Sequence, residues 1–316
     1  MNILMIGNFG TSWDGSICDE EHVAAALEDL GHEVARWQRE ITNNTGWMVG
    51  TKFDFAIIAQ WDGYDKDLSR VNGDTIIESI RQYTDKVIYW TFDYQAKGQE
   101  WHEKLIEGCD LYLSAQFEDN PKHRWLPQAF APMFLDEDLP VKQRQEFGED
   151  KEYDVIFTGT YIPQGMFRAE VLKAVDKKYN LSVFSVTQNE WRAQGLKNVY
   201  GPVLDYDLPK LIAKAKINLS VDLFPGNMGC WSDRNAQIMA CGGLVLYKYA
   251  RLSEEEFGGG VAYFNTVDEC LEKIDYLLKN PEAAKDIAEA GYKIAHTRLM
   301  VIHRVENLLT IIENTL

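Results

Sequence analysis

Residues 216–247 read KINLSVDLFPGNMGCWSDRNAQIMACGGLVLY, and their pattern predicts the fold class of the chain. It holds two short apolar runs, Lys216–Val221 and Gly243–Tyr247, whose length and composition predict buried strands. A loop rich in Pro, Gly and Asn follows the first run. A helix is predicted after that loop over Ser232–Cys241, with Ser232 as its N-cap and Gly242 as its stop. A strand, a crossover helix and a second strand predict a parallel sheet covered by helices.

The same alternation runs along both halves of the chain. Further strands are expected at Ile3–Ile6, Glu33–Trp37, Phe55–Ala59, Val87–Thr91, Leu111–Ser114, Asp154–Thr158, Ser182–Ser185 and Val261–Tyr263. Further helices are expected at Asp19–Leu30, Asp74–Thr84, Gln99–Glu107, Gln164–Lys178, Asp207–Lys214, Val267–Leu278, Pro281–Ala295 and Met300–Ile312. The pattern predicts an α/β protein with two Rossmann-like domains of similar size.

The boundary between the domains is marked by a change in composition. The stretch Asp136–Asp154 is rich in charge, contains Pro140 and Gly148, and lacks apolar periodicity, as a linker does. We therefore expect an N-terminal acceptor domain over 1–136, a linker over 137–152 and a C-terminal nucleotide-sugar domain over 153–298. The last helix, over 299–316, is expected to cross back to the first domain.

Charge and composition exclude several classes of protein. The formal net charge of −17 disfavours a general nucleic-acid binder, and 46% hydrophobic residues exclude a disordered chain. No uncharged run approaches the ~20 apolar residues of a membrane-spanning helix, and no basic segment precedes the first strand as in a secretory leader. The five cysteines are scattered without a C-x-x-C pair, which favours reduced thiols and a cytoplasmic location.

The loop after the first strand, Gly7–Ser16, is not predicted to bind a dinucleotide. Its glycines do not have the G-x-G-x-x-G spacing, and Asp19, Glu20 and Glu21 open the next helix, where they would repel a pyrophosphate. A Walker A loop is absent. The residues Gly10, Thr11 and Ser12 are instead predicted to line the acceptor side of the site.

Two aspartates are candidates for catalysis because each follows a strand, at the edge where open α/β sheets bind ligands. Asp14 lies in the loop after the first strand, and Asp93 follows the strand that ends at Thr91. Either carboxylate can accept the proton of an acceptor hydroxyl or orient that hydroxyl. The alternatives are a turn residue for Asp14 and a helix cap for Asp93.

Candidate anion-binding residues lie in the second half. Gly159 and Thr160 form a small-residue turn after a strand, and Arg168 lies in the following helix, a combination that predicts a phosphate site with free backbone amides. The loop residue Asn227 and the helix residues Ser232, Arg234 and Gln237 would complete the site, with Arg234 and Gln237 on one helix face. The alternatives are an ordinary turn with a surface arginine and, for Arg234, an ion pair with Asp233 or with a neighbouring domain residue.

Metal signals are weak. The runs Asp205-Tyr206-Asp207 and Asp65-Lys66-Asp67 have a D-x-D pattern, but neither ends an apolar strand, and Asp207 is placed like a helix N-cap. The six histidines show no spacing typical of metal ligands. We expect no metal and no other cofactor.

The second half resembles the group-1 glycosyltransferases, in particular their spore-maturation (CgeB-like) branch. The motifs that carry the resemblance are an F-x-G strand end, a downstream arginine, an A-K-I-N-L run, an S-x-R block before A-C-G-G, and a C-terminal tail. They are matched by Phe157–Gly159, Arg168, Ala215–Leu219, Ser232 with Arg234, Ala240–Gly243 and Tyr276–Glu282. The first half resembles the family in pattern alone.

The resemblance implies a GT-B fold, with two Rossmann-like domains facing across a cleft. It implies transfer of a sugar from a nucleotide-sugar donor, UDP-linked, to a hydroxyl acceptor, with the donor on the second domain and no metal. One departure is that Gly229 and Gln237 stand where related retaining enzymes have two glutamates. The alternatives are a phage-type DNA glycosyltransferase acting on hydroxylated bases and a non-catalytic nucleotide-sugar-binding module.

Overall fold

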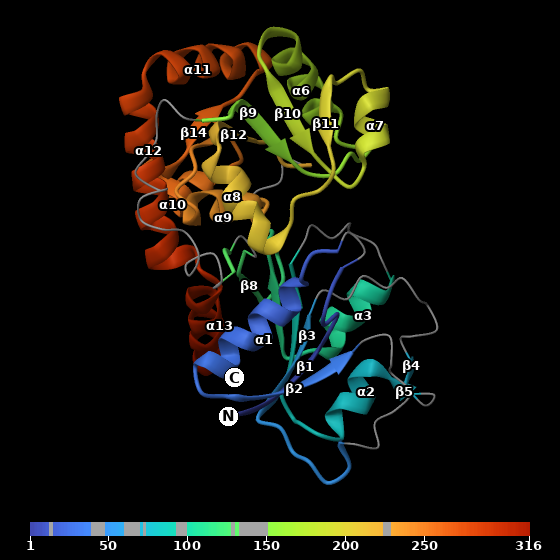
Figure 1. Ribbon diagram of the computed structural model, residues 1–316. Helices are drawn as coiled ribbons and strands as arrows, with labels where there is room; N and C mark the ends of the chain where they lie inside the picture. Colours follow the sequence, from blue (N-terminus) through green and yellow to red (C-terminus); the bar gives the residue numbers. More distant parts are fainter. Residues whose placement is uncertain are drawn as a thin grey trace. The chain divides into compact units, whose positions relative to one another are not determined.

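The computed structural model describes residues 1–12, 15–38, 48–59, 70–71, 74–92, 100–127, 130–132, 151–223 and 229–316. The chain divides into two compact units, each with its own sheet (Figure 1). Unit 1 comprises Met1–Gln128 and Val301–Leu316, and unit 2 comprises Ala129–Met300. The predicted linker residues 137–150 lie outside the described residues, as does much of the stretch around them.

Unit 1 contains a parallel six-stranded sheet with the order β2-β1-β3-β6-β7-β8. Its strands are β1 (Asn2–Gly7), β2 (Glu33–Gln38), β3 (Phe55–Ala59), β6 (Val87–Thr91), β7 (Leu111–Ser114) and β8 (His123–Trp125). The helices are α1 (Asp19–Asp29), α2 (Ile76–Arg81), α3 (Glu100–Gly108) and α13 (Val301–Thr315), and a small antiparallel pair joins β4 (Arg70–Val71) to β5 (Asp74–Thr75). The strand order reverses between β1 and β3.

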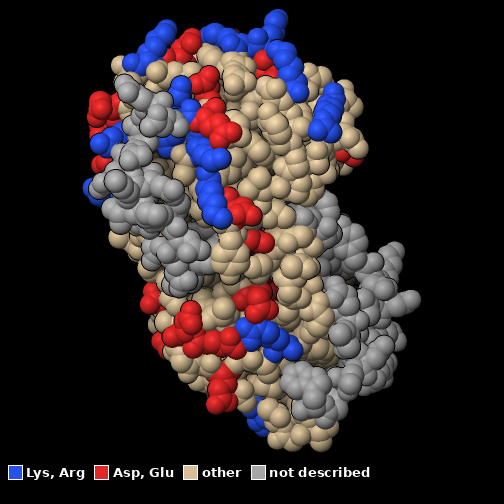
Figure 2. Space-filling model, in the orientation of Figure 1, with Lys and Arg blue, Asp and Glu red and all other residues tan. Residues whose placement is uncertain are grey.

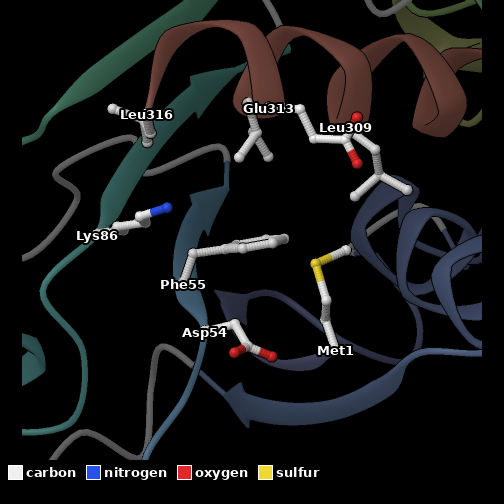
Figure 3. A pocket seen from close by; sticks show the side chains of 8 residues that line it. Met1, Asp54, Phe55, Lys86, Leu309, Glu313 and Leu316 are labelled. Atoms are coloured by element: carbon white, nitrogen blue, oxygen red, sulfur yellow. The ribbon is translucent and has the colours of Figure 1, made fainter.

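The last helix, α13, packs on unit 1 because its apolar residues repeat at helical spacing. Val301, Val305, Leu308 and Ile312 are buried and form a stripe along one face. The helix lies against α1, as Figure 1 shows. Its last turns cover a cavity of about 300 Å³ at the amino-terminal ends of β1, β3 and β6, where the ring of Phe55 forms part of the wall (Figure 3).

Unit 2 contains a second parallel six-stranded sheet, with the order β11-β10-β9-β12-β13-β14. Its strands are β9 (Tyr153–Thr158), β10 (Leu181–Phe184), β11 (Asn198–Tyr200), β12 (Ala215–Ser220), β13 (Val245–Lys248) and β14 (Ala262–Phe264). This is the strand order of a Rossmann fold, and the order reverses between β9 and β12. Ligands of such sheets bind at the carboxyl ends of the strands on either side of that reversal.

Helices cover both faces of the sheet of unit 2. They are α6 (Met166–Lys178), α7 (Gln188–Ala193), α8 (Leu208–Ala213), α9 (Arg234–Ala240), α10 (Ser253–Phe257), α11 (Val267–Lys279) and α12 (Pro281–Ile294), with short turns η3 (Asp205–Asp207), η4 (Gly258–Gly260) and η5 (Ala295–Leu299). The main core packs α6, α11 and α12 on one face of β9, β12 and β13. Gly243 lies between α9 and β13, and a Cβ there would lie 2.5 Å from Ile212 Cγ2 of α8 and 2.8 Å from Ile238 Cγ2 of α9. A side chain at this position would therefore force the two helices to shift.

The predicted fold class is confirmed, and most predicted elements match within a few residues. The predicted start of the helix Asp74–Thr84 is wrong, because Asp74 and Thr75 form β5, which pairs with β4, and the helix starts at Ile76. Among the described residues, six short strands and helices were not predicted, namely β4, β5, β8, β11, α7 and α10. Within the part of the chain that the structure describes, no helix is both long and apolar enough to cross a membrane.

Candidate anion-binding site

The site of unit 2 lies where its strand order reverses. Gly159 and Thr160 follow β9, and Asp222 lies two residues beyond the end of β12. Lys248 is the last residue of β13, the next strand in the sheet. Because these strands are parallel, their carboxyl ends meet at one edge, and side chains from distant parts of the sequence converge there.

Arg168 is buried in the first turn of α6 and donates hydrogen bonds to the backbone at the ends of two strands. Its Nε donates a hydrogen bond to the carbonyl oxygen of Val221 at 2.8 Å, and its Nη1 donates to that of Thr160 at 3.2 Å. Burial, and then the like charge of Arg234, lowers the pKa of Arg168 to about 9, against the opposing effect of Asp222. The side chain is therefore still a cation at neutral pH, and its position is fixed by backbone carbonyls.

Arg234 is the first residue of α9 and lies beside Arg168. Its guanidinium carbon is 5.3 Å from the ring centroid of Phe157, and the same ring is 5.8 Å from the guanidinium carbon of Arg168. Arg234 Nη1 is buried and has no hydrogen-bond partner among the residues that the structure describes. A buried guanidinium nitrogen without an acceptor is costly, and its place next to a second cation indicates an anion-binding site.

Gly159 makes room for this arrangement. Its φ of +154° is a conformation that residues with a side chain rarely adopt, and a Cβ there would lie 2.9 Å from Arg234 Nη2. The prediction of a free amide at Gly159 is wrong, because its N–H donates to the carbonyl oxygen of Phe184 at 3.1 Å, in continuation of the pairing between β9 and β10. Its carbonyl oxygen accepts from Trp191 Nε1 at 3.1 Å.

Asp222 is a buried acid that the sequence analysis missed. Its Oδ1 accepts from the backbone N–H of Ser232 at 3.1 Å, and its Oδ2 accepts from the hydroxyl of Tyr247. Burial raises its pKa, while the Tyr247 hydrogen bond and the charges of Arg234 and Arg168 oppose that rise. The signal was present, because Asp222 follows an apolar strand just as Asp93 does.

Lys248 adds a third cation at this edge. Its Nζ lies 5.8 Å from the ring centroid of Phe167 and donates to the carbonyl oxygen of Tyr249 at 3.0 Å. Burial lowers its pKa, and the charges of Glu269 and Asp222 partly restore it. This residue was also missed by the sequence analysis.

The predicted start of α9 needs correction. The helix begins at Arg234 with Asp233 as its N-cap, and Ser232 lies one residue earlier. The Ser232 hydroxyl accepts from the backbone N–H of Arg234 at 3.3 Å and donates to Asp233 Oδ1 at 3.0 Å, while Gln237 Nε2 donates to Asp233 Oδ2. Asp233 thus accepts hydrogen bonds from neutral groups, and the described residues show no Arg234–Asp233 ion pair, which contradicts the alternative of an ion pair with Asp233.

Three predicted site residues, Asp14, Asp93 and Asn227, lie outside the described residues. The predicted acceptor-side residues Gly10, Thr11 and Ser12 follow β1 and belong to a loop that folds back on itself. The carbonyl oxygen of Gly10 accepts from Cys18 N–H at 2.9 Å, Thr11 bridges Ile17, and Ser12 N–H donates to Ser16 at 2.7 Å.

A carboxylate of the protein occupies the place of a dinucleotide phosphate in unit 1. Glu20, in the first turn of α1, is 5% exposed, and its Oε1 accepts from the backbone N–H of Asn8 at 3.2 Å. A Cβ on Gly7 would lie 2.7 Å from Glu20 Cγ. The helix N-terminus, which would otherwise attract an anion, is therefore already neutralised by this side chain.

The D-x-D run at 205–207 forms the turn η3 before α8. Asp207 occupies the N-cap position of α8 and forms a 2.8 Å ion pair with Lys210. The second run, Asp65-Lys66-Asp67, lies outside the described residues. Within the described ranges, no three His, Cys, Asp or Glu side chains form a group that could hold a metal ion.

Part of the chain matches a known protein family. Residues 168–310 match the family model described as glycosyl transferase-like. This segment begins at Arg168 and includes Asp222, Ser232, Arg234 and Lys248. A search of curated protein sequences found no match.

Solved glycosyltransferase structures superimpose on nearly the whole chain. A sucrose-phosphate synthase from Thermosynechococcus elongatus has a TM-score of 0.71 at 10% identity, over 99% of this chain and 98% of that chain. HepE from Anabaena, in complex with UDP-glucose, has a TM-score of 0.68 at 13% identity, over 99% of this chain and all of that chain. An alpha-glucosyltransferase in complex with UDP and a 13-mer DNA has a TM-score of 0.68 at 11% identity, over 99% and 100% of the two chains.

At these identities the structural likeness establishes the fold alone, and the family match points to glycosyl transfer for the segment that it covers. The chain therefore has the GT-B fold of the glycosyltransferases, and its residues 168–310 match the glycosyl transferase-like family model.

Proposed function

We propose that this enzyme transfers a sugar from a UDP-linked donor to a hydroxyl acceptor, and that unit 2 binds the donor's diphosphate at Arg168 and Arg234. We also propose that it belongs to the spore-maturation branch that its motifs resemble. The observation that carries the donor site is Arg234 Nη1, which is buried beside a second buried guanidinium and has no acceptor among the described residues. An anion with several oxygens satisfies both the charge and the missing hydrogen bond.

The two arginines differ in what they offer a diphosphate. Arg168 already donates to two backbone carbonyls, so it is rigid and contributes mainly charge. Arg234 keeps donors available for phosphate oxygens, which a guanidinium contacts in a fork. When the bond between the sugar and the diphosphate breaks, negative charge develops on the departing phosphate, and preorganised cations stabilise that charge.

The nucleotide and the cofactor requirement follow from separate arguments. UDP is proposed as the nucleotide because HepE and the alpha-glucosyltransferase were solved with UDP or UDP-glucose. Independence of metal is proposed because Arg168, Arg234 and Lys248 supply positive charge at the same strand ends. Asp14 and Asp93 stay our candidates for the base or acceptor-holding group, and Gly10, Thr11 and Ser12 for the acceptor-side loop.

The DNA-modifying alternative is weaker. One solved relative was captured with DNA, but the net charge of this chain is −17. Figure 2 shows acidic side chains gathered on the visible face of unit 1, in the region of α1, whose first turn carries three acids. A phosphate backbone would be repelled from such a surface. Filter binding at low and high salt distinguishes the two functions, since DNA binding would weaken steeply with salt.

We propose that the protein is located in the cytoplasm. Four of the five cysteines are buried, and burial raises the pKa of Cys109 to about 11 and that of Cys270 to about 12. Thiols of this kind are unreactive and suit a reducing compartment.

Calorimetric titration with UDP and UDP-glucose, together with release of UDP from UDP-glucose, tests the proposed function. We expect both nucleotides to bind, NAD and ATP to bind more weakly, and UDP to be released without a metal. Slow hydrolysis of the donor in the absence of an acceptor would argue against a non-catalytic binding module. Failure of a panel of nucleotide sugars to bind would contradict the proposal.

A further inference from the structure

Asp222 lies inside a site that is otherwise built from cations, yet neutral groups hold it in place. Its two hydrogen-bond donors are the backbone N–H of Ser232, at 3.1 Å, and the hydroxyl of Tyr247. In the part of unit 2 that the structure describes, no ion pair joins Asp222 to Arg168 or Arg234. The carboxylate is therefore fixed without engaging the guanidinium groups directly, and Arg234 Nη1 stays without a partner there.

The three charges nevertheless affect one another. The positive charge of Arg234 lowers the pKa of Arg168, and the negative charge of Asp222 raises it. Burial raises the pKa of Asp222 overall, and the charges of both arginines reduce that rise. In the free protein, the carboxylate thus compensates the repulsion between the two guanidinium groups.

We propose that the Asp222 carboxylate is a built-in counterion, which balances Arg168 and Arg234 in the free protein and weakens their hold on a bound diphosphate. This inference rests on the proposed function, in which that site binds the donor's diphosphate. A diphosphate brings its own negative charges next to the buried carboxylate, and the repulsion between them lowers the affinity. Such a residue limits how tightly the product UDP is retained after transfer.

A purely structural role for Asp222 predicts the opposite effect on ligand binding. Through Ser232 and Tyr247, the carboxylate also joins the start of α9 to β13, so losing it could simply displace Arg234. The Asp222→Asn substitution separates the two roles because the amide keeps the shape, accepts from Ser232 and donates to the Tyr247 oxygen, while the charge is removed. If Asp222 is a counterion, removing its charge makes the protein bind anions more tightly.

The test is calorimetric titration with inorganic pyrophosphate and with UDP near neutral pH, combined with thermal unfolding of the free proteins. For Asp222→Asn we expect about tenfold tighter binding of both ligands, the change that corresponds to 1.4 kcal/mol, and thermal unfolding shows whether the variant is folded. Asp176→Asn is the matched control, because Asp176 is a buried acid on α6 that pairs with Lys197 outside the site. This control should leave both affinities unchanged.

A double variant covers the case in which Asp222→Asn does not fold. Asp222→Asn combined with Arg234→Gln restores the wild-type charge of the site and removes the repulsion between the arginines. Because one negative charge is lost, we expect it to bind pyrophosphate about tenfold more tightly than Arg234→Gln alone. If Asp222 acts by holding α9 in place, the double variant binds no better than the single one.

The outcomes distinguish this inference from the proposed function. Weaker pyrophosphate binding by Asp222→Asn than by the wild type would overturn the counterion role. Equal pyrophosphate binding by the double variant and by Arg234→Gln would overturn it as well. In either case, UDP binding by the wild type would still support the proposed function. The variants could bind pyrophosphate more tightly while the wild type binds UDP no better than pyrophosphate. That result would support the counterion role of Asp222 and contradict the proposal of a UDP-linked donor. If the wild type binds neither ligand, both are overturned.

Discussion

Replacement of Arg234 by alanine is expected to remove donor binding without unfolding the protein. Arg234 is the first residue of α9, where the helix dipole disfavours a cation, and it lies beside the like charge of Arg168. Its contribution to folding is limited to contacts such as that with the ring of Phe157, 5.3 Å from its guanidinium carbon. We therefore expect the melting temperature to change by no more than a few degrees.

The loss of affinity follows from the unpaired nitrogen. If Nη1 and its neighbour donate charge-assisted bonds to phosphate oxygens, their removal costs roughly 1.5–3 kcal/mol, or about tenfold to a hundredfold in the dissociation constant for UDP. Arg234→Lys keeps the charge and loses the fork, so an intermediate affinity is expected. The matched control is Lys177→Ala, which removes one exposed cation near the end of α6.

Titration calorimetry with UDP measures the affinities, and thermal unfolding shows that each variant is folded. Normal UDP binding by a folded Arg234→Ala protein would refute the assignment of Arg234 as the phosphate anchor. In that case Arg168 would become the better candidate. Equal losses in Arg234→Ala and Lys177→Ala would indicate a general effect of charge rather than a specific contact.

Three further predictions concern the site and the fold. Gly159→Ala should weaken UDP binding, because its Cβ would lie 2.9 Å from Arg234 Nη2; unchanged affinity by calorimetry would show that Arg234 can shift without loss. Treatment with EDTA should leave UDP release from UDP-glucose largely intact, whereas loss of activity that manganese restores would reveal a required metal. Burial lowers the pKa of His22 to about 4, so unit 1 should lose about 3 kcal/mol of stability as the pH falls from about 6.5 toward 4. Because the unfolded chain takes up the proton first in this window, His22→Gln should flatten the decline, and an unchanged pH profile in urea unfolding would contradict the cause.

The fold could be predicted from the sequence because its strands are strongly apolar and buried. Phe55–Ala59 and Val87–Thr91 were placed without error, since β3 and β6 are central strands in which every residue is buried. Edge and near-edge elements gave weaker signals. β8 has a histidine and an arginine among its three residues, and β11 is three residues long, so neither has a periodicity that distinguishes it from a loop.

The candidate site residues that follow a local sequence pattern could be predicted, whereas those that depend on contacts between strands could not. Arg168 and Arg234 were identified from local patterns, namely a cation near the start of a helix that follows a strand. Asp222 and Tyr247 were missed because their roles arise from a hydrogen bond between neighbouring strand ends, which depends on the order of strands in the sheet. The amide of Gly159 was misjudged for the same reason, because its acceptor, Phe184, belongs to β10.

A crystal structure of the protein with UDP would locate the proposed diphosphate site directly. We predict that the diphosphate lies at the carboxyl ends of β9 and β12, with its oxygens accepting hydrogen bonds from Arg234 Nη1 and facing Arg168. A diphosphate bound elsewhere, with Arg234 Nη1 paired to an acceptor of the protein itself, would contradict the central claim.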